Sequence, residues 1–197
     1  MFGFLKKPAA RQTPSLRREQ LQPRIKHVHF IDALRQAGVP QEQWPCTTPL
    51  CGELLVTYAF DLADGFVMAT PAMLREAGVI GDELAELGRA NLRRAMPQPQ
   101  FFAKDGCGLA HTGGELEATL LLLDEVWQRM QPNFAGTILA TVPRRDRILL
   151  CDGADPAATA ALARQTGEFF DEQDDAHRLS TQLMRRNGDG WSLFNAH

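Results

Sequence analysis

The sequence predicts an α+β fold, in which an antiparallel sheet is built from successive β-hairpins and helices pack on one face of that sheet. Three stretches repeat one order of elements, namely two short apolar runs around a turn followed by a helical pattern. The residues expected to cap the three helices, Thr70, Thr112 and Asp155, recur at intervals of 42 and 43 residues. Hairpins that precede helices favour antiparallel pairing over a doubly wound parallel sheet.

Length and composition fit a globular protein. A chain of 197 residues typically buries about 70% of its unfolded surface, and 44% hydrophobic with 23% charged residues is an ordinary globular composition. No window approaches the roughly 18 apolar residues of a membrane span, and the basic N-terminus lacks the order of a secretory signal. We therefore expect a cytoplasmic protein with no transmembrane segment and with four reduced cysteines.

Charge is divided unevenly along the chain. Residues 1–27 contain seven Lys and Arg residues and one acidic residue, a balance of +6, and the remainder carries −9. We interpret residues 1–23 as a basic, partly flexible arm and residues 24–197 as a single domain. Residues 1–27 could contact an anionic surface, although folding back onto the acidic body is the simpler expectation. The acidic body argues against specific binding of nucleic acid.

The N-terminal part of the domain is expected to be helical. Residues 13–38 read as two short helical pieces that are broken at Pro23, and the second piece ends at Gly38. A segment rich in proline and cysteine, residues 39–52, then reads as a connector into the core.

The first hairpin and helix unit begins with apolar residues that alternate from Leu54 to Leu62, as in a strand with one buried face. Asp64-Gly65 supplies the positive φ values of a two-residue hairpin turn. Thr70 can cap a helix whose first residue is Pro71, where the missing N–H group has no intrahelical partner to lose. The helical pattern continues after a break near residues 78–81.

Two further units and a terminal hairpin follow. Residues 100–111 give two short strands around Asp105-Gly106, and the next helix is expected over residues 111–130, with Thr112 and Glu115 spaced as a capping box. A third hairpin precedes a helix that begins at Asp155-Pro156. The last hairpin turns at the sequence NGDG.

Asn91 is the polar residue that fits its surroundings least well, because it falls on the apolar stripe of its helix. A buried amide must find partners for two donors and one acceptor. Asn91 therefore either locks a neighbouring backbone segment or lines a pocket, and the structural lock is the favoured interpretation.

Metal ligands are present without a recognisable metal-binding pattern. His27 and His29 would share one side of a strand, as metal-binding His-x-His pairs do, but no further ligand completes the pair and a surface or capping role is expected. We predict no cofactor and no metal. The weak alternative is a zinc site whose spacing differs from that of fingers and ribbons, formed by Cys46, Cys51, Cys107 and His111.

Familiar catalytic motifs do not occur in the sequence. G-x-S-x-G, a Walker loop, H-E-x-x-H and C-x-x-C are all missing. Acidic residues recur at turns and strand ends, where Asp commonly has a structural role. Two carboxylates that converge within about 5 to 9 Å could support glycosidase-type acid and base chemistry. The catalytic candidates on this basis are Asn91, Glu117, Asp146 and Asp152.

Five successive blocks of the sequence follow a recognisable order. They are PLCGELLVTYAFDLADGFVMATPAML, ELGRANLRRAMP, GGELEATLLLLDEVW, GTILATVPRRDRILLCD and LSTQLMRRNGDGWSLF. In this order they resemble the bacterial YtpQ-like family of uncharacterised proteins. The resemblance implies a bacterial protein without an established activity. The residues that match recurring motifs by this resemblance are Asn91–Arg93, Gly114, Glu117–Thr119, Val142–Pro143, Asp146 and Asp152.

The leading functional hypothesis is a non-enzymatic binding or adaptor module for a protein segment or a small ligand. It rests on abundant scaffold signals and on the missing catalytic motifs. The binding candidates are Asn91, Arg93, Gly114 and Glu117. The alternative is a hydrolase-type enzyme that uses Asn91 together with clustered carboxylates.

Overall fold

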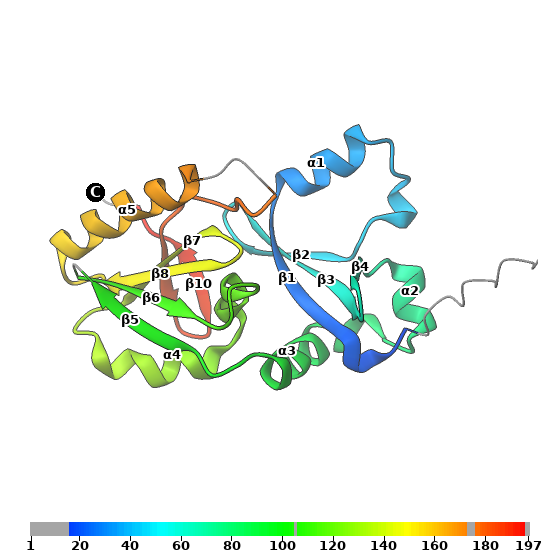
Figure 1. Ribbon diagram of the computed structural model, residues 1–197, viewed down its shortest axis with the longest axis horizontal. Coiled ribbons are helices and arrows are strands. Elements are labelled where there is room, and N and C mark those ends of the chain that lie inside the picture. The colour runs from blue at the N-terminus through cyan, green and yellow to red at the C-terminus, as the bar shows by residue number, and fades with distance from the viewer. Residues whose placement is uncertain (1–15, 105, 173–175, 196–197) are drawn as a thin grey trace, which may run out of the picture.

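The computed structural model describes residues 16–104, 106–172 and 176–195, and Figure 1 shows two antiparallel sheets side by side. The predicted α+β class and antiparallel pairing are confirmed, although the strands are divided between two sheets. Sheet A has the order β1–β3–β2, with β4 also paired to β3. Its strands are β1 (Leu21–His27), β2 (Thr47–Cys51), β3 (Leu54–Leu62) and β4 (Gly65–Met68).

Among the described residues, sheet B has six strands in the order β10–β9–β7–β8–β6–β5. They are β5 (Gln100–Lys104), β6 (Cys107–His111), β7 (Ile138–Arg144), β8 (Arg147–Asp152), β9 (Met184–Asn187) and β10 (Gly190–Leu193). The α-helices of the described part are α1 (His29–Gln36), α2 (Pro71–Glu76), α3 (Leu84–Ala95), α4 (Asp124–Met130) and α5 (Pro156–Asp171). Short 3-10 helices are η1 (Arg18–Gln20), η2 (Gln41–Gln43), η3 (Gly81–Glu83), η4 (Glu117–Leu122) and η5 (Gln131–Asn133).

Strand β1 is the main departure from the sequence prediction, which placed helices on both sides of Pro23. Residues 21–27 instead pair with β3 in an unbroken antiparallel register, from Leu21 opposite Phe60 to His27 opposite Leu54. Pro23 fits this strand because β1 lies at the edge of sheet A. The helical prediction is correct for α1, which ends shortly before Gly38 as expected, and before Pro23 it is met only by the short 3-10 helix η1.

The segment predicted as a connector also contributes a strand. β2 pairs with the first half of β3, and a register shift occurs between Pro49 and Cys51. β4 pairs with the second half of the same edge of β3. The proline obscures the strand in the sequence because it cannot donate a ladder hydrogen bond, and an edge position tolerates it.

The first hairpin and helix unit forms as predicted, with a small difference at the turn. Leu62 pairs with Gly65, so the two turn residues are Ala63 and Asp64 rather than Asp64 and Gly65. The Thr70 hydroxyl accepts a hydrogen bond from the Met73 N–H at 3.3 Å, and Pro71 is the first residue of α2.

The second unit keeps its hairpin, but the helix predicted over residues 111–130 is divided into η4 and α4. The predicted capping box of Thr112 and Glu115 is wrong. The Glu117 carboxylate, not that of Glu115, accepts the Thr112 N–H at 2.8 Å. Gly114, with a φ of 86°, bends the chain so that Glu117 can reach back.

The third unit and the terminal hairpin agree with the prediction. The Asp155 carboxylate caps α5 by accepting the N–H groups of Ala157 and Ala158, at 2.8 and 3.1 Å. β9 and β10 form the hairpin around the NGDG turn.

The main hydrophobic core is shared by both sheets, and helices cover both faces of sheet B rather than one. Leu21 and Phe60 from sheet A belong to the same buried cluster as Ile138 and Ile148 from sheet B. Trp127 of α4 belongs to this cluster, whereas α5 covers the other face of sheet B over a second, smaller cluster. Figure 1 shows α5 and α4 on opposite sides of the sheet.

The beginning of the described chain is folded into sheet A. Leu21 is fully buried, and Arg18 pairs with Glu83 at 2.7 Å. Residues 1–15 of the predicted arm lie outside the described residues, so its flexibility and its contact with an anionic surface remain predictions. The predicted domain boundary after residue 23 falls within β1. No helix in the described part is long and apolar enough to cross a membrane.

We predict that Gly88→Ala destabilises the protein, because an added Cβ would lie 2.7 Å from Cε1 of the buried Tyr58. The overpacking cost is about 1 to 3 kcal/mol, although alanine normally favours a helix by about 1 kcal/mol over glycine. Gly167→Ala on α5 is the matched control, since a Cβ there meets no atom within 4 Å. Urea denaturation should show opposite shifts for the two variants, and two shifts of the same sign would contradict this packing.

Candidate functional site

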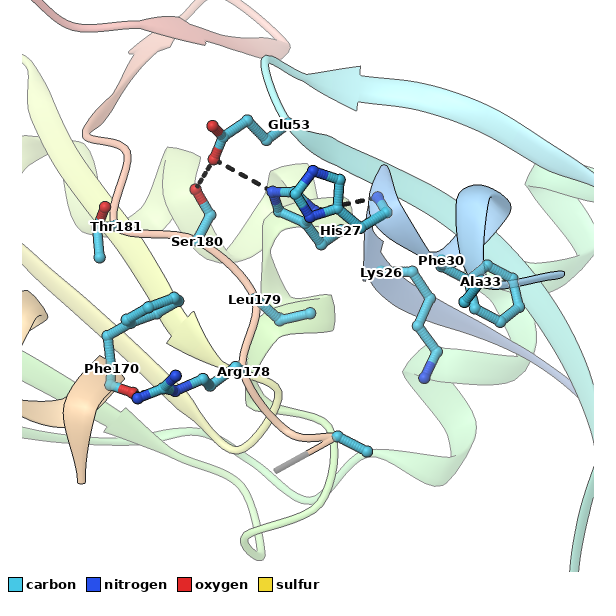
Figure 2. Close-up of a pocket in the computed structure, with 12 residues that line it drawn as sticks. Lys26, His27, Phe30, Ala33, Glu53, Phe170, Arg178, Leu179, Ser180 and Thr181 are labelled. Atoms are coloured by element: carbon cyan, nitrogen blue, oxygen red, sulfur yellow. Dashed lines mark hydrogen bonds and ion pairs between the residues drawn. The ribbon is translucent and has the colours of Figure 1, made fainter. Parts of the chain in front are cut away.

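A groove with a volume of about 560 Å³ opens between the two halves of the protein. One wall is formed by the end of β1 and by α1, which contribute Lys26, His27 and Phe30 (Figure 2). The opposite wall is formed by the end of α5 and by residues 176–181, which lead into β9. The groove is therefore built from segments that are far apart in the sequence.

Glu53, in the turn between β2 and β3, connects the two walls of the groove. Its Oε2 atom accepts a hydrogen bond from the Ser180 hydroxyl at 2.8 Å and lies 3.4 Å from His27 Nε2 (Figure 2). His27 Nδ1 accepts the backbone N–H of His29 at 3.1 Å. In the neutral imidazole the proton therefore lies on Nε2, the nitrogen that faces Glu53.

These three groups are not arranged as a catalytic triad. In a triad, histidine lies between serine and the carboxylate and takes the serine proton. Here the Glu53 carboxylate lies between His27 and Ser180, and Ser180 is only 2% exposed. The Ser180 hydroxyl also accepts the Gln182 N–H at 3.1 Å. This geometry gives Ser180 a role in holding the two halves together.

Lys26 is a partly buried basic group of the groove. Burial lowers the pKa of its ammonium group, and the neighbouring charges of Arg145 and Arg24 lower that pKa further. Lys26 Nζ lies 5.6 Å from the centre of the Phe30 ring, a favourable cation–π geometry. The folded protein thus keeps the Lys26 amine beside two other positively charged groups, Arg145 and Arg24.

Aromatic and cationic groups also combine on the opposite wall. The Arg178 guanidinium lies 4.7 Å from the centre of the Phe170 ring, and its Nε donates to the Phe170 carbonyl at 2.7 Å. Asp171 accepts a further, longer hydrogen bond from Arg178 at 3.3 Å. These contacts fix a positive group and a ring face at the end of α5.

The structure places Asn91 as a lock on the N-terminal segment. Its side-chain N–H groups donate to the carbonyls of Arg18 at 2.7 Å and Leu21 at 2.8 Å, and its carbonyl accepts from Arg94. Asn91 is 2% exposed. The side chain therefore holds η1 and β1 against α3, as the favoured interpretation of the sequence proposed.

Gly114 and Glu117 form a second backbone lock. Glu117 is fully buried, and its Oε1 atom accepts the N–H groups of Thr112 and of Gly114, the latter at 2.6 Å. His111 Nδ1 lies 3.3 Å from the same oxygen. Glu117 Oε2 is buried without a hydrogen-bond partner in the described part of the protein.

The other acidic candidates belong to turns. Asp152 accepts the N–H groups of Ala135, Gly136 and Ala154, which hold its carboxyl pKa below the usual value. Asp146 lies in the turn between β7 and β8 and accepts from Arg147 at 2.9 Å.

None of the four catalytic candidates lines the groove. Arg93, a binding candidate, forms an exposed two-bond ion pair with Glu125, which links α3 to α4 and lowers the pKa of that carboxyl.

The proposed zinc ligands are divided between the two sheets. Cys46 and Cys51 belong to the β2 region of sheet A, whereas Cys107 and His111 lie on β6 of sheet B. Among the described residues, no group of three or more His, Cys, Asp or Glu side chains could hold a metal ion. Cys107 lies opposite Cys151, and burial raises the pKa of Cys151 to about 11.

Sequence reasoning missed the residues that line the groove, apart from the His27 and His29 pair. The histidines were singled out for their spacing, and they do lie together, with ring centres 4.2 Å apart. Lys26, Glu53 and Arg178 have no shared motif, because their proximity depends on how the two sheets pack. Recognition of β1 as a strand would have helped to find the groove, since Lys26 lies on that strand.

We predict that Asn91→Ala destabilises the protein by about 2 to 4 kcal/mol, because it leaves the buried Leu21 carbonyl and the partly buried Arg18 carbonyl without their donors. Arg93→Ala, an exposed change on the same helix, is the control. Equilibrium denaturation measures both variants. A loss for Asn91→Ala no larger than that for Arg93→Ala would show that the lock contributes little.

We predict that the wild-type protein gains stability relative to Lys26→Met as the pH rises toward 10.5. Below the folded-state pKa of Lys26 both folded and unfolded chains carry the proton, and the penalty for the buried charge is constant. Above that pKa the folded chain releases the proton first, so the penalty declines until the unfolded chain also titrates.

Urea denaturation from pH 7 to pH 10.5 provides the measurement, with Arg75→Met as the control for a lost exposed charge. A wild-type advantage that stays constant, or that falls with increasing pH, would contradict the shift.

The comparisons with known proteins identify a distant relative. The chain is 28% identical over 123 residues to a UPF0354 protein of Shouchella clausii (strain KSM-K16). The alignment covers 60% of this chain and 45% of that protein, so the chain spans less than half the length of the relative. No family model matches the chain, and no solved structure matches it. The relative supports an uncharacterised bacterial family, while the YtpQ-like name remains a prediction.

Proposed function

We propose that the protein is a binding module that takes a small organic anion in the groove between the two sheets. The observation that carries this proposal is the composition of the groove, whose described lining residues include Lys26, Arg178 and two histidines but one carboxylate, that of Glu53. Arg178 is also paired with Asp171 at the end of α5. Phe30 and Phe170 provide ring faces beside these charges. An anion with an aromatic or apolar body would satisfy both features.

The size of the groove supports a small molecule over a protein segment. Its volume of about 560 Å³ falls within the roughly 300 to 1,000 Å³ of typical small-molecule sites. An extended peptide would more commonly add a strand to an open sheet edge. The walls of this groove are instead made of the end of β1, two helix ends, a turn and a connecting segment, and no long open strand edge lines it among the described residues.

The binding hypothesis has better support than the hydrolase alternative. Asn91, Glu117 and Asp152 each hold backbone groups, Asn91 through its amide N–H groups, Glu117 through Oε1 and Asp152 through both carboxylate oxygens. Ser180 and His27 do not contact each other as a nucleophile and its base would, since Glu53 lies between them. Binding alone needs none of these groups to be reactive.

We predict that aromatic anions stabilise the protein through the groove. At about ten times their Kd, phenyl phosphate or benzoate should raise the melting temperature by about 3 °C or more, whereas benzylamine, a matched cation, should not. Phe30→Ala should remove this shift, because it deletes a ring face from the groove.

Phe102→Ala is the control, since Phe102 lies on β5 and is 54% exposed. Differential scanning fluorimetry measures the shifts. Equal shifts for anions and for benzylamine, or an unaltered shift in Phe30→Ala, would count against the groove as the binding site.

A further inference from the structure

We infer that Arg24, Lys26 and Arg145 form a phosphate subsite beside the groove, which takes the phosphate group of a phosphate monoester whose body lies in the groove. The inference rests on the proposed function and specifies the chemical class of the ligand. All three side chains line one small pocket, together with Phe66, Glu115 and Thr119. Lys26 lines this pocket and also the groove, so the two sites are adjacent.

The backbone holds the three cations in place. Arg24 and Lys26 are two residues apart on β1 and therefore project from the same face of the strand. Arg145 lies in the turn between β7 and β8. Its backbone N–H donates to the His177 carbonyl at 2.8 Å, and its backbone carbonyl accepts the Ala118 N–H at 3.0 Å. The subsite thus joins one strand of sheet A to one turn of sheet B.

The acidic groups beside the cluster do not match its positive charge. Asp61 pairs with Arg24, and Glu115 reaches Arg145 only at 3.5 Å with a side chain that is 74% exposed. Three positive groups thus face two carboxylates, and Lys26 has no carboxylate ion pair among the described contacts. The remaining positive charge attracts an anion, and the charges of Arg145 and Arg24 add to the burial that lowers the pKa of Lys26.

Both arginines have hydrogen-bonding capacity that the described part of the protein does not use. Arg24 Nε and Arg145 Nε are buried without a hydrogen-bond partner. A buried donor without an acceptor is costly, and natural structures rarely keep one without a reason. Phosphate suits this surplus of donors better than a carboxylate does, because a monoester offers three terminal oxygens to three cations.

Without a ligand, the Glu115 carboxylate contacts Arg145, which is the contact that the phosphate group would take over. The pocket has a volume of about 20 Å³, roughly the room for one water molecule, so a phosphate group requires movement of a lining side chain. The exposed Glu115 carboxylate can leave Arg145 into solvent at little cost, because its contact is long and screened. Phosphate then replaces one carboxylate with a group of higher charge.

Replacement of the Glu115 carboxylate by phosphate predicts opposite changes in ligand affinity for two variants. Arg145→Gln should weaken the binding of phenyl phosphate about tenfold, the effect of losing one charged hydrogen bond to the phosphate. Glu115→Gln should strengthen the binding several-fold, because it removes the competing carboxylate. Arg164→Gln, which alters an exposed arginine paired to Glu168 on α5, should leave the affinity unchanged.

Isothermal titration calorimetry with phenyl phosphate and benzoate at constant ionic strength tests the subsite. Arg145→Lys should recover part of the affinity, which a loss of fold would not allow, and circular dichroism checks the fold of each variant. Unchanged phenyl phosphate affinity in both Arg145→Gln and Glu115→Gln would overturn the inference. A benzoate affinity that depends more strongly on Arg145 than that of phenyl phosphate would overturn the choice of phosphate.

The subsite and the groove can fail separately. Loss of phenyl phosphate binding in Phe30→Ala, with normal binding in Arg145→Gln, would retain the groove and reject the subsite. Loss in Arg145→Gln, with normal binding in Phe30→Ala, would retain the phosphate subsite and reject the groove as the site of the ligand body.

Discussion

The register of β1 against β3 is the constraint on which the rest of the structure depends. In this register Leu21, Pro23 and Ile25 alternate with Gln22, Arg24 and Lys26. Leu21 and Ile25 enter the core shared by both sheets, while Arg24 and Lys26 line the pocket that faces Arg145. Because side chains in a strand alternate, a slip of one residue would bury the cations and expose the core residues. Core burial therefore fixes the positions of the charged groups.

The same constraint explains why the polar residues that attracted attention in the sequence have structural roles. Asn91 binds one backbone carbonyl of η1 and one at the beginning of β1, and so anchors the edge strand to α3. Glu117 fixes the bend at the start of η4, and the next residue, Ala118, donates its backbone N–H to the Arg145 carbonyl. Buried polar side chains are costly unless they form hydrogen bonds. Asn91 and Glu117, both buried, therefore indicate backbone segments that the hydrophobic core alone would not hold.

Much of the fold could be predicted from the sequence, because its signals are local. Alternating apolar residues and the cap residues Thr70 and Asp155 act within a few positions, and the hairpins and helix starts follow from them. β1 could not be identified in this way, since its partner β3 lies about thirty residues further along the chain and Pro23 resembles a helix break. The groove was even harder to predict from the sequence. Lys26, Glu53 and Arg178 become neighbours only through the packing of the two sheets, which no short window encodes.

The cation cluster shows how a site can arise from ordinary residues. Lysine and arginine on an edge strand or in a turn are normal surface residues, and neither Lys26 nor Arg145 belongs to any motif. Their significance comes from the contact between sheets A and B, which brings them beside Arg24 and partly removes them from water. A fold selected for stability alone would replace one of these cations with a neutral or acidic side chain, because like charges in a partly buried site repel. The arrangement is explained if an anion occupies the site during function, since the bound ligand then supplies the negative charge that the protein lacks.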